Sequence, residues 1–228
     1  MNTIIIPILP VNEEIEHIAL ECLRRIQTFT RNYHLIAVIN GEGGGTEDFR
    51  KKVGAVAHET VMFEGRLGYA KAINEGLRLV DPSSEFVTIG SCDIYVAENW
   101  QNHLQVPPLA LISPLDMSKS HEKDVGYRGS FWAAWWTMPS SLVVALGPFD
   151  EKFNLRFAAN DYAIRAYEIG WSARRALIHF DHVAAKHSSV GPGFDRAIRA
   201  EERAFRNQWG GAYNYRTWVE GPGSTGSK

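Results

Sequence analysis

Continuous apolar runs alternate with apolar residues at helical spacing along the start of the chain. Residues 3–9 form an apolar run, which predicts a strand covered on both faces, and Pro7 and Pro10 are expected to end it. Residues 15–26 then carry apolar side chains every three or four positions, as on one face of a helix. Residues 34–40 predict a second strand. The chain therefore opens as strand, helix, strand.

The same alternation continues through another helix to a fourth strand. Residues 61–63 close a third strand. The helix that follows carries its apolar face on Ala70, Ile73, Leu77 and Val80. Residues 85–94 contain an apolar run that ends at two small residues. Asp93 and an isoleucine follow them. The alternation predicts an α/β fold with a mainly parallel central sheet flanked by helices.

The regular pattern fades after residue 94. Residues 109–113 predict one more short strand, and the polar residues 117–126 predict a loop. An aromatic block at 131–136 holds three tryptophans, which are more often core residues than platforms for a sugar, although stacking on a ligand stays open. A last helix is predicted over Phe194–Trp209, with four arginines on one side. Such a stripe is usually a solvated face, and the alternative is contact with a phosphate-bearing acceptor.

Length and composition indicate one globular domain. With 228 residues, 45% of them hydrophobic, the chain can bury one sizeable core. We expect a single domain over residues 1–215 and a flexible C-terminal tail over residues 216–228. The formal net charge of -2 gives no broad basic field, so wholesale capture of nucleic acid or of an anionic membrane is not expected. A local basic patch stays open.

Cysteine usage and the N-terminal residues favour a soluble, cytoplasmic protein. Cys22, on a predicted helix face, and Cys92, after the fourth strand, make neither a disulfide framework nor a metal knuckle. The N-terminal residues lack the features of a signal peptide, and no apolar run approaches membrane-spanning length, so no transmembrane segment is expected.

Asp93 is the first candidate for chemistry. Open α/β sheets deliver side chains to a crevice at the carboxyl ends of their strands. An aspartate there could also serve only as a turn former or a helix cap. The glycines within residues 41–45 would let a ligand approach the backbone, or they could form a plain surface loop. Thr46 stands where a dinucleotide fingerprint has glycine, so that pattern matches weakly.

Five segments, in this order, together resemble the family 2 glycosyltransferases, closest to their rhamnosyltransferase-like branch. They are the opening strand and loop at 4–14, RLGYAKAINEG at 66–76, FVTIGSCDI at 86–94 with Trp100, GPFDEKF at 147–153, and Asp161 with Arg165, Gly170 and Trp171. The resemblance covers about residues 3–189. It implies a GT-A fold, which is Rossmann-like. It also implies an enzyme that moves a hexosyl or deoxyhexosyl group, with inversion, from a UDP- or dTDP-sugar to an acceptor hydroxyl.

A divalent cation, Mn²⁺ or Mg²⁺, is the cofactor that the resemblance implies, because charge develops on the diphosphate leaving group. Asp93 is the carboxylate at the matching position, and Ser91 stands where many relatives carry another aspartate. His182 and His187 lie where the family often places a metal-binding histidine, and the spacing favours His182. A core or exposed histidine is the alternative for either.

The donor-binding residues implied by the resemblance come from the ends of several predicted strands. They are Pro7, Leu9, Asn12, Asn40, Arg66, Gly68, Ser91, Cys92 and Asp93. Asn40 stands where relatives commonly have aspartate, and Arg66 where close relatives often have asparagine. For Arg66, an exposed arginine at a helix start is the alternative. Asn12 is also a good helix N-cap.

The proton acceptor is the largest departure from the family. An inverting transfer needs a carboxylate to take the proton of the acceptor hydroxyl. The family's glutamate–aspartate pair falls on Ala158 and Ala159, so Asp161 is the predicted base, although it could serve only to offset the helix dipole. Without a base, a retaining transferase or a sugar-nucleotide-binding module remains.

The acceptor is expected to be a glycan, a lipid-linked group or another hydroxyl, and a nucleic acid is less expected. A nucleotidyltransferase would carry a basic, glycine-rich loop after the first strand, and residues 7–10 are not such a loop.

Overall fold

A computed structural model describes residues 1–41, 44–103, 110–114, 134–154, 157–176, 180–183 and 194–209. The predicted loop at 117–126, Trp132, His187 and the tail at 216–228 lie outside these ranges. In chain order the elements are β1 (Asn2–Ile8), α1 (Glu13–Phe29), β2 (Tyr33–Asn40), α2 (Glu47–Val56), β3 (Glu59–Phe63), α3 (Tyr69–Leu77), β4 (Phe86–Gly90), β5 (Ile94–Tyr95), a 3-10 turn (Trp100–His103), β6 (Ala110–Pro114), β7 (Trp135–Pro139), α4 (Ser140–Leu146), α5 (Ala158–Glu168), β8 (Ser172–Ala176), β9 (Asp181–His182) and α6 (Phe194–Trp209).

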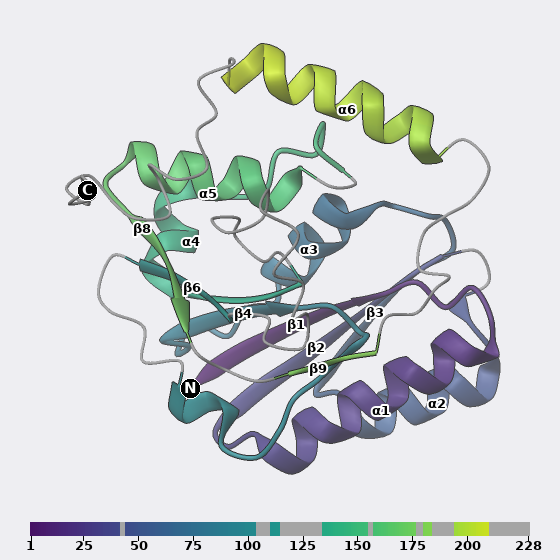
Figure 1. The fold of residues 1–228 in the computed structure, drawn as a ribbon. Helices are drawn as coiled ribbons and strands as arrows, with labels where there is room; N and C mark the ends of the chain where they lie inside the picture. The colour runs from purple at the N-terminus through teal and green to yellow at the C-terminus, as the bar shows by residue number, and fades with distance from the viewer. Residues whose placement is uncertain are drawn as a thin grey trace.

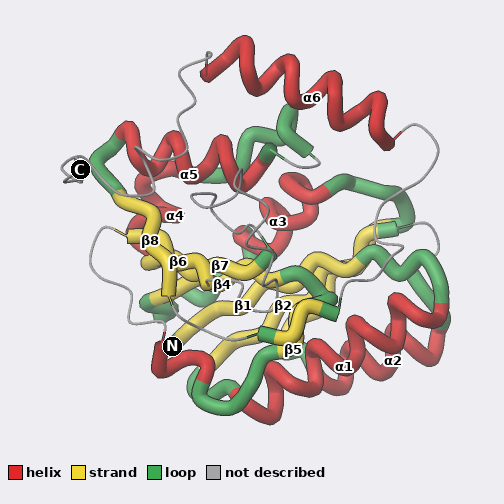
Figure 2. Tube along the Cα trace, in the orientation of Figure 1, coloured by secondary structure: helices red, strands yellow, loops and turns green. Residues whose placement is uncertain are grey.

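Seven of the described strands form one sheet, in the order β3-β2-β1-β4-β7-β6-β8. β1 pairs parallel with β2 and β4, β2 pairs parallel with β3, and β6 pairs parallel with β8. β7 is antiparallel to both of its neighbours, β4 and β6. Among these seven strands, β7 therefore runs against the other six. The predicted α/β fold with a mainly parallel central sheet is confirmed. Figure 2 shows the strands of the sheet lying between helices.

Helices cover both faces of this sheet (Figure 1). α1 and α2 lie on one face, and α3, α4, α5 and α6 lie on the other. β1 shows why its residues are apolar without alternation: Ile5 packs toward α3, whereas Ile4 and Ile6 pack toward α1. Both faces of the strand are buried, so both kinds of position are hydrophobic.

The expectation that Pro7 ends the first strand is wrong. β1 continues to Ile8, and Pro7 pairs with Val38 of β2. The pairing of β1 with β4 stops at Ile5 and Ile89. The missing N–H of a proline therefore disrupts less here than it would between two full ladders.

Elements with a clear local period have nearly the predicted bounds. α6 has the predicted ends, and β6 begins one residue later than the predicted 109–113. α3 ends at Leu77, so Val80 lies beyond the helix, although it still packs against the core. Among the described helices, none combines the length and hydrophobicity needed to cross a bilayer.

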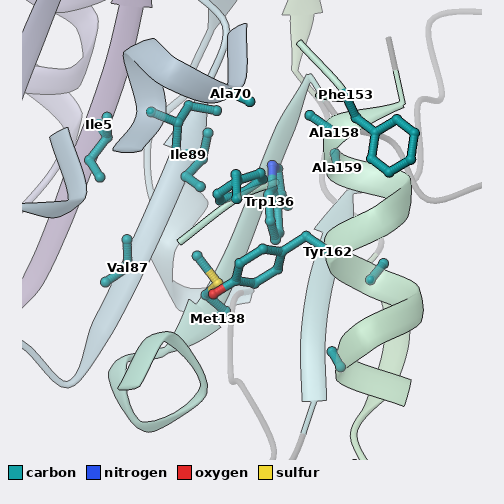
Figure 3. Packing of buried hydrophobic residues seen from close by; sticks show 14 of the residues in the cluster. Ile5, Ala70, Val87, Ile89, Trp136, Met138, Phe153, Ala158, Ala159 and Tyr162 are labelled. Atoms are coloured by element: carbon teal, nitrogen blue, oxygen red, sulfur yellow. The ribbon is translucent and has the colours of Figure 1, made fainter. Parts of the chain in front are cut away.

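Two of the three tryptophans in the aromatic block are core residues. Trp135 and Trp136 are adjacent on β7, so they point to opposite faces of the sheet, and both are fully buried. Trp135 packs edge-on against Trp100, with ring centroids 5.2 Å apart. Trp136 packs against Tyr162 of α5, with centroids 5.8 Å apart (Figure 3). Neither ring is open to a sugar.

Candidate functional site

Asp93 follows β4 at the carboxyl edge of the parallel strands. The residue is only 7% exposed. Its Oδ1 accepts a hydrogen bond from Ser91 Oγ at 2.5 Å, and its Oδ2 lies 3.2 Å from His182 Nε2. A carboxylate and an imidazole that are 89 positions apart in the chain therefore meet at one point.

A small second sheet brings His182 to this place. β9 pairs antiparallel with β5, so that Ile94 lies opposite His182. The N–H of Val183 donates to the carbonyl oxygen of Asp93 at 3.0 Å. Of the two histidines considered from the sequence, His182 adjoins Asp93, and His187 lies outside the described residues.

Burial and its neighbours have opposite effects on the Asp93 carboxyl group. Burial raises the pKa of Asp93, but hydrogen bonding with His182 and Ser91 and the charge of His182 outweigh it, so the net pKa is lowered. The carboxylate is consequently ionised at neutral pH.

Asp93 and His182 fit a divalent cation as a partial ligand set. Carboxylate oxygen and imidazole nitrogen are both donors that such ions accept in proteins. Within the described ranges no group of three or more His, Cys, Asp or Glu side chains could hold a metal. Burial raises the pKa of the neighbouring Cys92 thiol to about 12, so this thiol is protonated at neutral pH in the metal-free chain. Beyond the side chains that the structure describes, water or the oxygens of a bound diphosphate could complete the ligand set.

Two asparagines hold the loop before α3. Asn40, at the end of β2, accepts from Leu67 N at 2.5 Å and donates to Gly68 O at 3.3 Å. The side-chain amide of Asn154 donates to Leu67 O at 2.6 Å, and the backbone carbonyl oxygen of Asn154 accepts from Tyr69 N at 2.8 Å. The loop is therefore fixed from both sides.

Gly68 is required in this loop for two reasons. Its φ of +85° and ψ of 175° lie in a region that side chains rarely adopt. A Cβ at this position would also overlap the Asn154 amide. Sequence reasoning included Gly68 and Asn40 but missed Asn154, because its partners are about 87 residues away. An asparagine directly after the GPFDEKF segment was the only local signal.

The predicted donor-binding residues at the end of β1 and directly after it also lie at the carboxyl edge. Pro7 and Leu9 are half-buried, and a Cβ on Gly41 would come within 2.9 Å of Leu9 Cδ1. Asn12 caps α1, with its Oδ1 accepting from Ile15 N at 2.9 Å. The backbone of Leu9 also contacts the Cys92 thiol, so β1 and β4 end side by side.

The described part of the glycine-rich loop is held by a buried acid. Glu16 of α1 accepts from the N–H and the hydroxyl of Thr46, both at 2.8 Å. Thr46 in turn caps α2 through Phe49 N at 3.1 Å. Thr46 therefore has a structural role, and residues 42–43 of the loop lie outside the described ranges.

Arg66 is exposed on the loop between β3 and α3, two residues before Gly68. The Asn40 and Asn154 contacts fix the backbone immediately after it.

Asp161 lies in the first turn of α5 and is fully buried. Its Oδ2 accepts from Arg165 Nε at 2.9 Å. Its Oδ1 accepts from Trp209 Nε1 at 3.0 Å and from Gln208 Nε2 at 3.4 Å, both from α6. Burial raises the pKa of Asp161, and the Arg165 guanidinium only partly offsets this. This carboxylate joins α5 to α6.

Ala158 and Ala159 are core residues at the start of α5. Each is 1% exposed, in the cluster that contains Trp136 and Tyr162 (Figure 3). No acid therefore stands at these two positions, and the space is filled by apolar packing.

A separate open pocket lies at the opposite, amino edge of the sheet. Its lining includes Asn2, Arg31 and Glu85. Phe86, which lines this pocket, is the first residue of β4, whereas Asp93 follows the last residue of that strand. The pocket and Asp93 therefore lie at opposite ends of β4. It belongs to a different end of the strands from the site described above.

Neither a protein-family model nor a curated protein matches this chain in sequence. Solved structures match it in fold. The mannosyltransferase PcManGT from Pyrobaculum calidifontis, in complex with GDP-Man and Mn²⁺, has a TM-score of 0.65 and 17% identity over 88% of this chain and 60% of its own. Glucosyl-3-phosphoglycerate synthase from Mycobacterium tuberculosis, in complex with Mn²⁺, UDP and phosphoglyceric acid, has a TM-score of 0.65 and 13% identity over 92% and 78%. S. aureus TarS has a TM-score of 0.57 and 12% identity over 90% and 40%.

These comparisons establish the GT-A fold. Identities this low show the fold alone. The chain spans 60% of the mannosyltransferase and 40% of TarS, so both of those proteins carry further residues beyond the shared fold.

Proposed function

We propose that this protein is a glycosyltransferase that uses a nucleoside-diphosphate sugar together with a divalent cation. The observation that carries the proposal is the Asp93–His182 pair, buried at the carboxyl edge of the parallel strands. Ligands of open α/β folds bind at this edge. Three proteins with the same fold were solved with GDP-Man and Mn²⁺, with Mn²⁺ and UDP, and with UDP-GlcNAc.

The donor in this proposal is a UDP- or dTDP-sugar, and the group transferred is a hexosyl or deoxyhexosyl unit, as in the rhamnosyltransferase-like branch. Pro7, Leu9 and Asn12 would line the base and ribose side. The loop held by Asn40 and Asn154 would present Arg66 and the backbone of Gly68 to the donor. Ser91, Cys92 and Asp93 would lie beside the diphosphate.

Asp93 and His182 would hold Mn²⁺ or Mg²⁺, which neutralises the charge that develops on the diphosphate leaving group. Ser91 orients the Asp93 carboxylate through its 2.5 Å hydrogen bond. The lowered pKa of Asp93 keeps that carboxylate ionised, so it can bind a cation without first losing a proton. Because the described residues offer only two protein ligands at this point, the cation and the sugar nucleotide are expected to bind together.

Asp161 is the proposed base of an inverting transfer. Its raised pKa makes it a stronger proton acceptor than an ordinary aspartate. Its hydrogen bonds to Trp209 and Gln208 would have to open before an acceptor hydroxyl could reach it.

A second function has one observation in its favour. Ala158 and Ala159 are packed into the core where the family carries acids, so a sugar-nucleotide-binding module without turnover is the second candidate. The alanines at positions 158 and 159 are also compatible with a retaining transferase, because a retaining transfer does not need that base.

Titration calorimetry with UDP and MnCl₂ tests the proposal. We expect the wild-type chain to bind UDP only when Mn²⁺ is present. Asp93→Asn and His182→Ala should weaken that binding by at least about tenfold, the lower end of the loss when even an outer partner of a metal ligand is removed. Asp48→Asn and His17→Ala, both exposed on other elements, are matched controls that should bind normally. Equal binding by Asp93→Asn would sink the metal assignment.

A turnover assay then separates the two candidate functions. Release of UDP from UDP-sugars, alone and with hydroxyl acceptors, supports a transferase. Mn²⁺-dependent binding without turnover of any UDP-, dTDP- or GDP-sugar supports the binding module.

A further inference from the structure

α6 carries four arginines along one stripe. They are Arg196, Arg199, Arg203 and Arg206. At about 100° per residue, these positions fall within about 80° of the helix circumference, and at about 1.5 Å per residue they span about 15 Å. All four side chains are exposed. The row is therefore straight and faces solvent.

The opposite side of α6 anchors the helix to the core. Phe205 is 2% exposed and packs against Phe157, with ring centroids 4.8 Å apart and the rings tilted by 31°. Trp209 Nε1 donates to Asp161, and Gln208 bonds to both Asp161 and Lys152. Figure 1 shows α6 as the outermost helix on its side of the sheet. These contacts fix the orientation of the arginine row.

The charge of this row is only partly compensated. Arg206 pairs with Glu202 at 2.6 Å. Arg196, Arg199 and Arg203 have no ion pair within the described residues. Glu201, the other acid of the middle turns, is 7% exposed and faces inward. Exposed Ala197, Ala200 and Ala204 lie along the same outer side of the helix and leave the guanidinium groups unshielded.

We infer that this face of α6 docks on the anionic headgroups of a lipid bilayer. A straight row of guanidinium groups flanked by alanines matches a flat layer of phosphates. Over residues 196–209, where the side chains of α6 are described, no large apolar side chain is exposed that could insert into the acyl region, so attraction is electrostatic and reversible. Single-stranded nucleic acid would call for exposed aromatic rings on which bases stack. Phe205 and Trp209 instead point to the core.

The inference is independent of the proposed function, because it concerns a different face and a different ligand. Docking brings α6, and with it the adjoining α5, next to the headgroup layer. A failure of donor binding would leave the docking result unchanged, and the reverse also holds.

Vesicle flotation with the full chain tests the inference. We expect the protein to float with phosphatidylcholine vesicles that contain phosphatidylglycerol, and not with phosphatidylcholine alone. Raising the salt from about 0.1 M to about 1 M shortens the Debye length from about 10 Å to about 3 Å and should release it.

Two charge-matched variants locate the contact. Arg196→Gln/Arg199→Gln/Arg203→Gln should lower the partition coefficient on the order of a hundredfold, since each basic residue near an anionic surface contributes about 1 kcal/mol. Arg24→Gln/Lys51→Gln/Lys52→Gln removes the same charge from α1 and α2, on the other side of the sheet, and should bind as the wild type does. All six substituted side chains are exposed, so both variants are expected to fold, and unchanged thermal melting checks this.

Three results would overturn the inference. They are no flotation with anionic vesicles, equal loss in both variants, and binding of single-stranded nucleic acid by the wild type with no vesicle binding.

Discussion

Asp161 can be tested as a single residue through the pH dependence of stability. Its pKa is raised in the folded chain, so the folded state binds more protons than the unfolded state at pH values between the two pKa values. The stability that this group contributes is therefore present below its unfolded pKa and falls as the pH rises through the folded pKa. Asp161→Asn removes this dependence.

We expect urea unfolding to show the wild type losing stability relative to Asp161→Asn as the pH rises from about 4 toward 7. Parallel stability curves would contradict a raised pKa. If Asp161 is also the base, the same variant should lower turnover by about 10² to 10⁴-fold while UDP affinity stays unchanged. Glu168→Gln, which removes an exposed acid from the other end of α5, is the control.

Asn154 and Gly68 form a pair whose coupling can be measured. Asn154→Ala removes a 2.6 Å hydrogen bond to Leu67 O and a weaker one from Lys71 N, and should lower the free energy of unfolding by about 1–3 kcal/mol. Gly68→Ala should cost more, because the new Cβ overlaps Asn154 and the backbone is strained.

The double variant should be more stable than the sum of the two losses predicts, because removal of the Asn154 amide relieves the overlap. A double-mutant cycle by urea denaturation measures this. Additive losses would show that the two residues do not contact each other in solution. Weaker UDP binding by Asn154→Ala is expected if the loop presents the donor.

Among the secondary-structure elements, β4 depends most on one small residue. Gly90 pairs with Trp135 of β7, and a Cβ on Gly90 would overlap the Trp135 ring. Gly90→Ala should lower the free energy of unfolding by about 1–3 kcal/mol through overpacking. It should also weaken metal-dependent donor binding, because Asp93 follows this strand directly.

Gly54→Ala is the matched control on α2. Nothing lies within 4 Å of a Cβ at Gly54, and alanine favours a helix over glycine by about 1 kcal/mol. Thermal denaturation should therefore show Gly54→Ala unchanged or more stable. If Gly90→Ala behaved in the same way, the close packing of β4 on β7 would be wrong.

At the scale of the whole molecule, the fold brings one candidate metal ligand from each half of the chain to the same point. Asp93 follows β4, and His182 lies on β9, so a cation between them would tie the two halves together. A ligand present at about 100 times its dissociation constant stabilises the folded state by about 2.7 kcal/mol. For a domain of this size, that corresponds to a rise in Tm of about 5–10 °C.

We expect this rise only with UDP and Mn²⁺ together, and EDTA should abolish it. The wild type and His182→Ala should have similar melting temperatures without ligands and differ with them. A UDP-induced shift that persists in EDTA would argue against a metal-assisted donor site.

Local sequence patterns were sufficient to predict the elements in which burial alone decides which positions are apolar. The buried run of β1, the helical face of α1 and the ends of α6 follow from periodicity, because burial on one or both faces selects side chains position by position. The same holds for the α/β alternation and for Asp93 at the end of β4. The sequence did not predict where β7 ends and α4 begins. Trp135 and Trp136 are adjacent and both apolar, so they show neither the alternation of a half-buried strand nor the spacing of a helix.

Long-range packing decided the rest. Pairing of β5 with β9 brings His182 next to Asp93; spacing along the sequence favoured His182 over His187, but it could not show which side chain His182 contacts. Contact with α6 buried Asp161, and contact with the loop at Gly68 gave Asn154 its role. An amino-acid type specifies which bonds a side chain can make, whereas its partners depend on which distant segments the folded chain brings within reach.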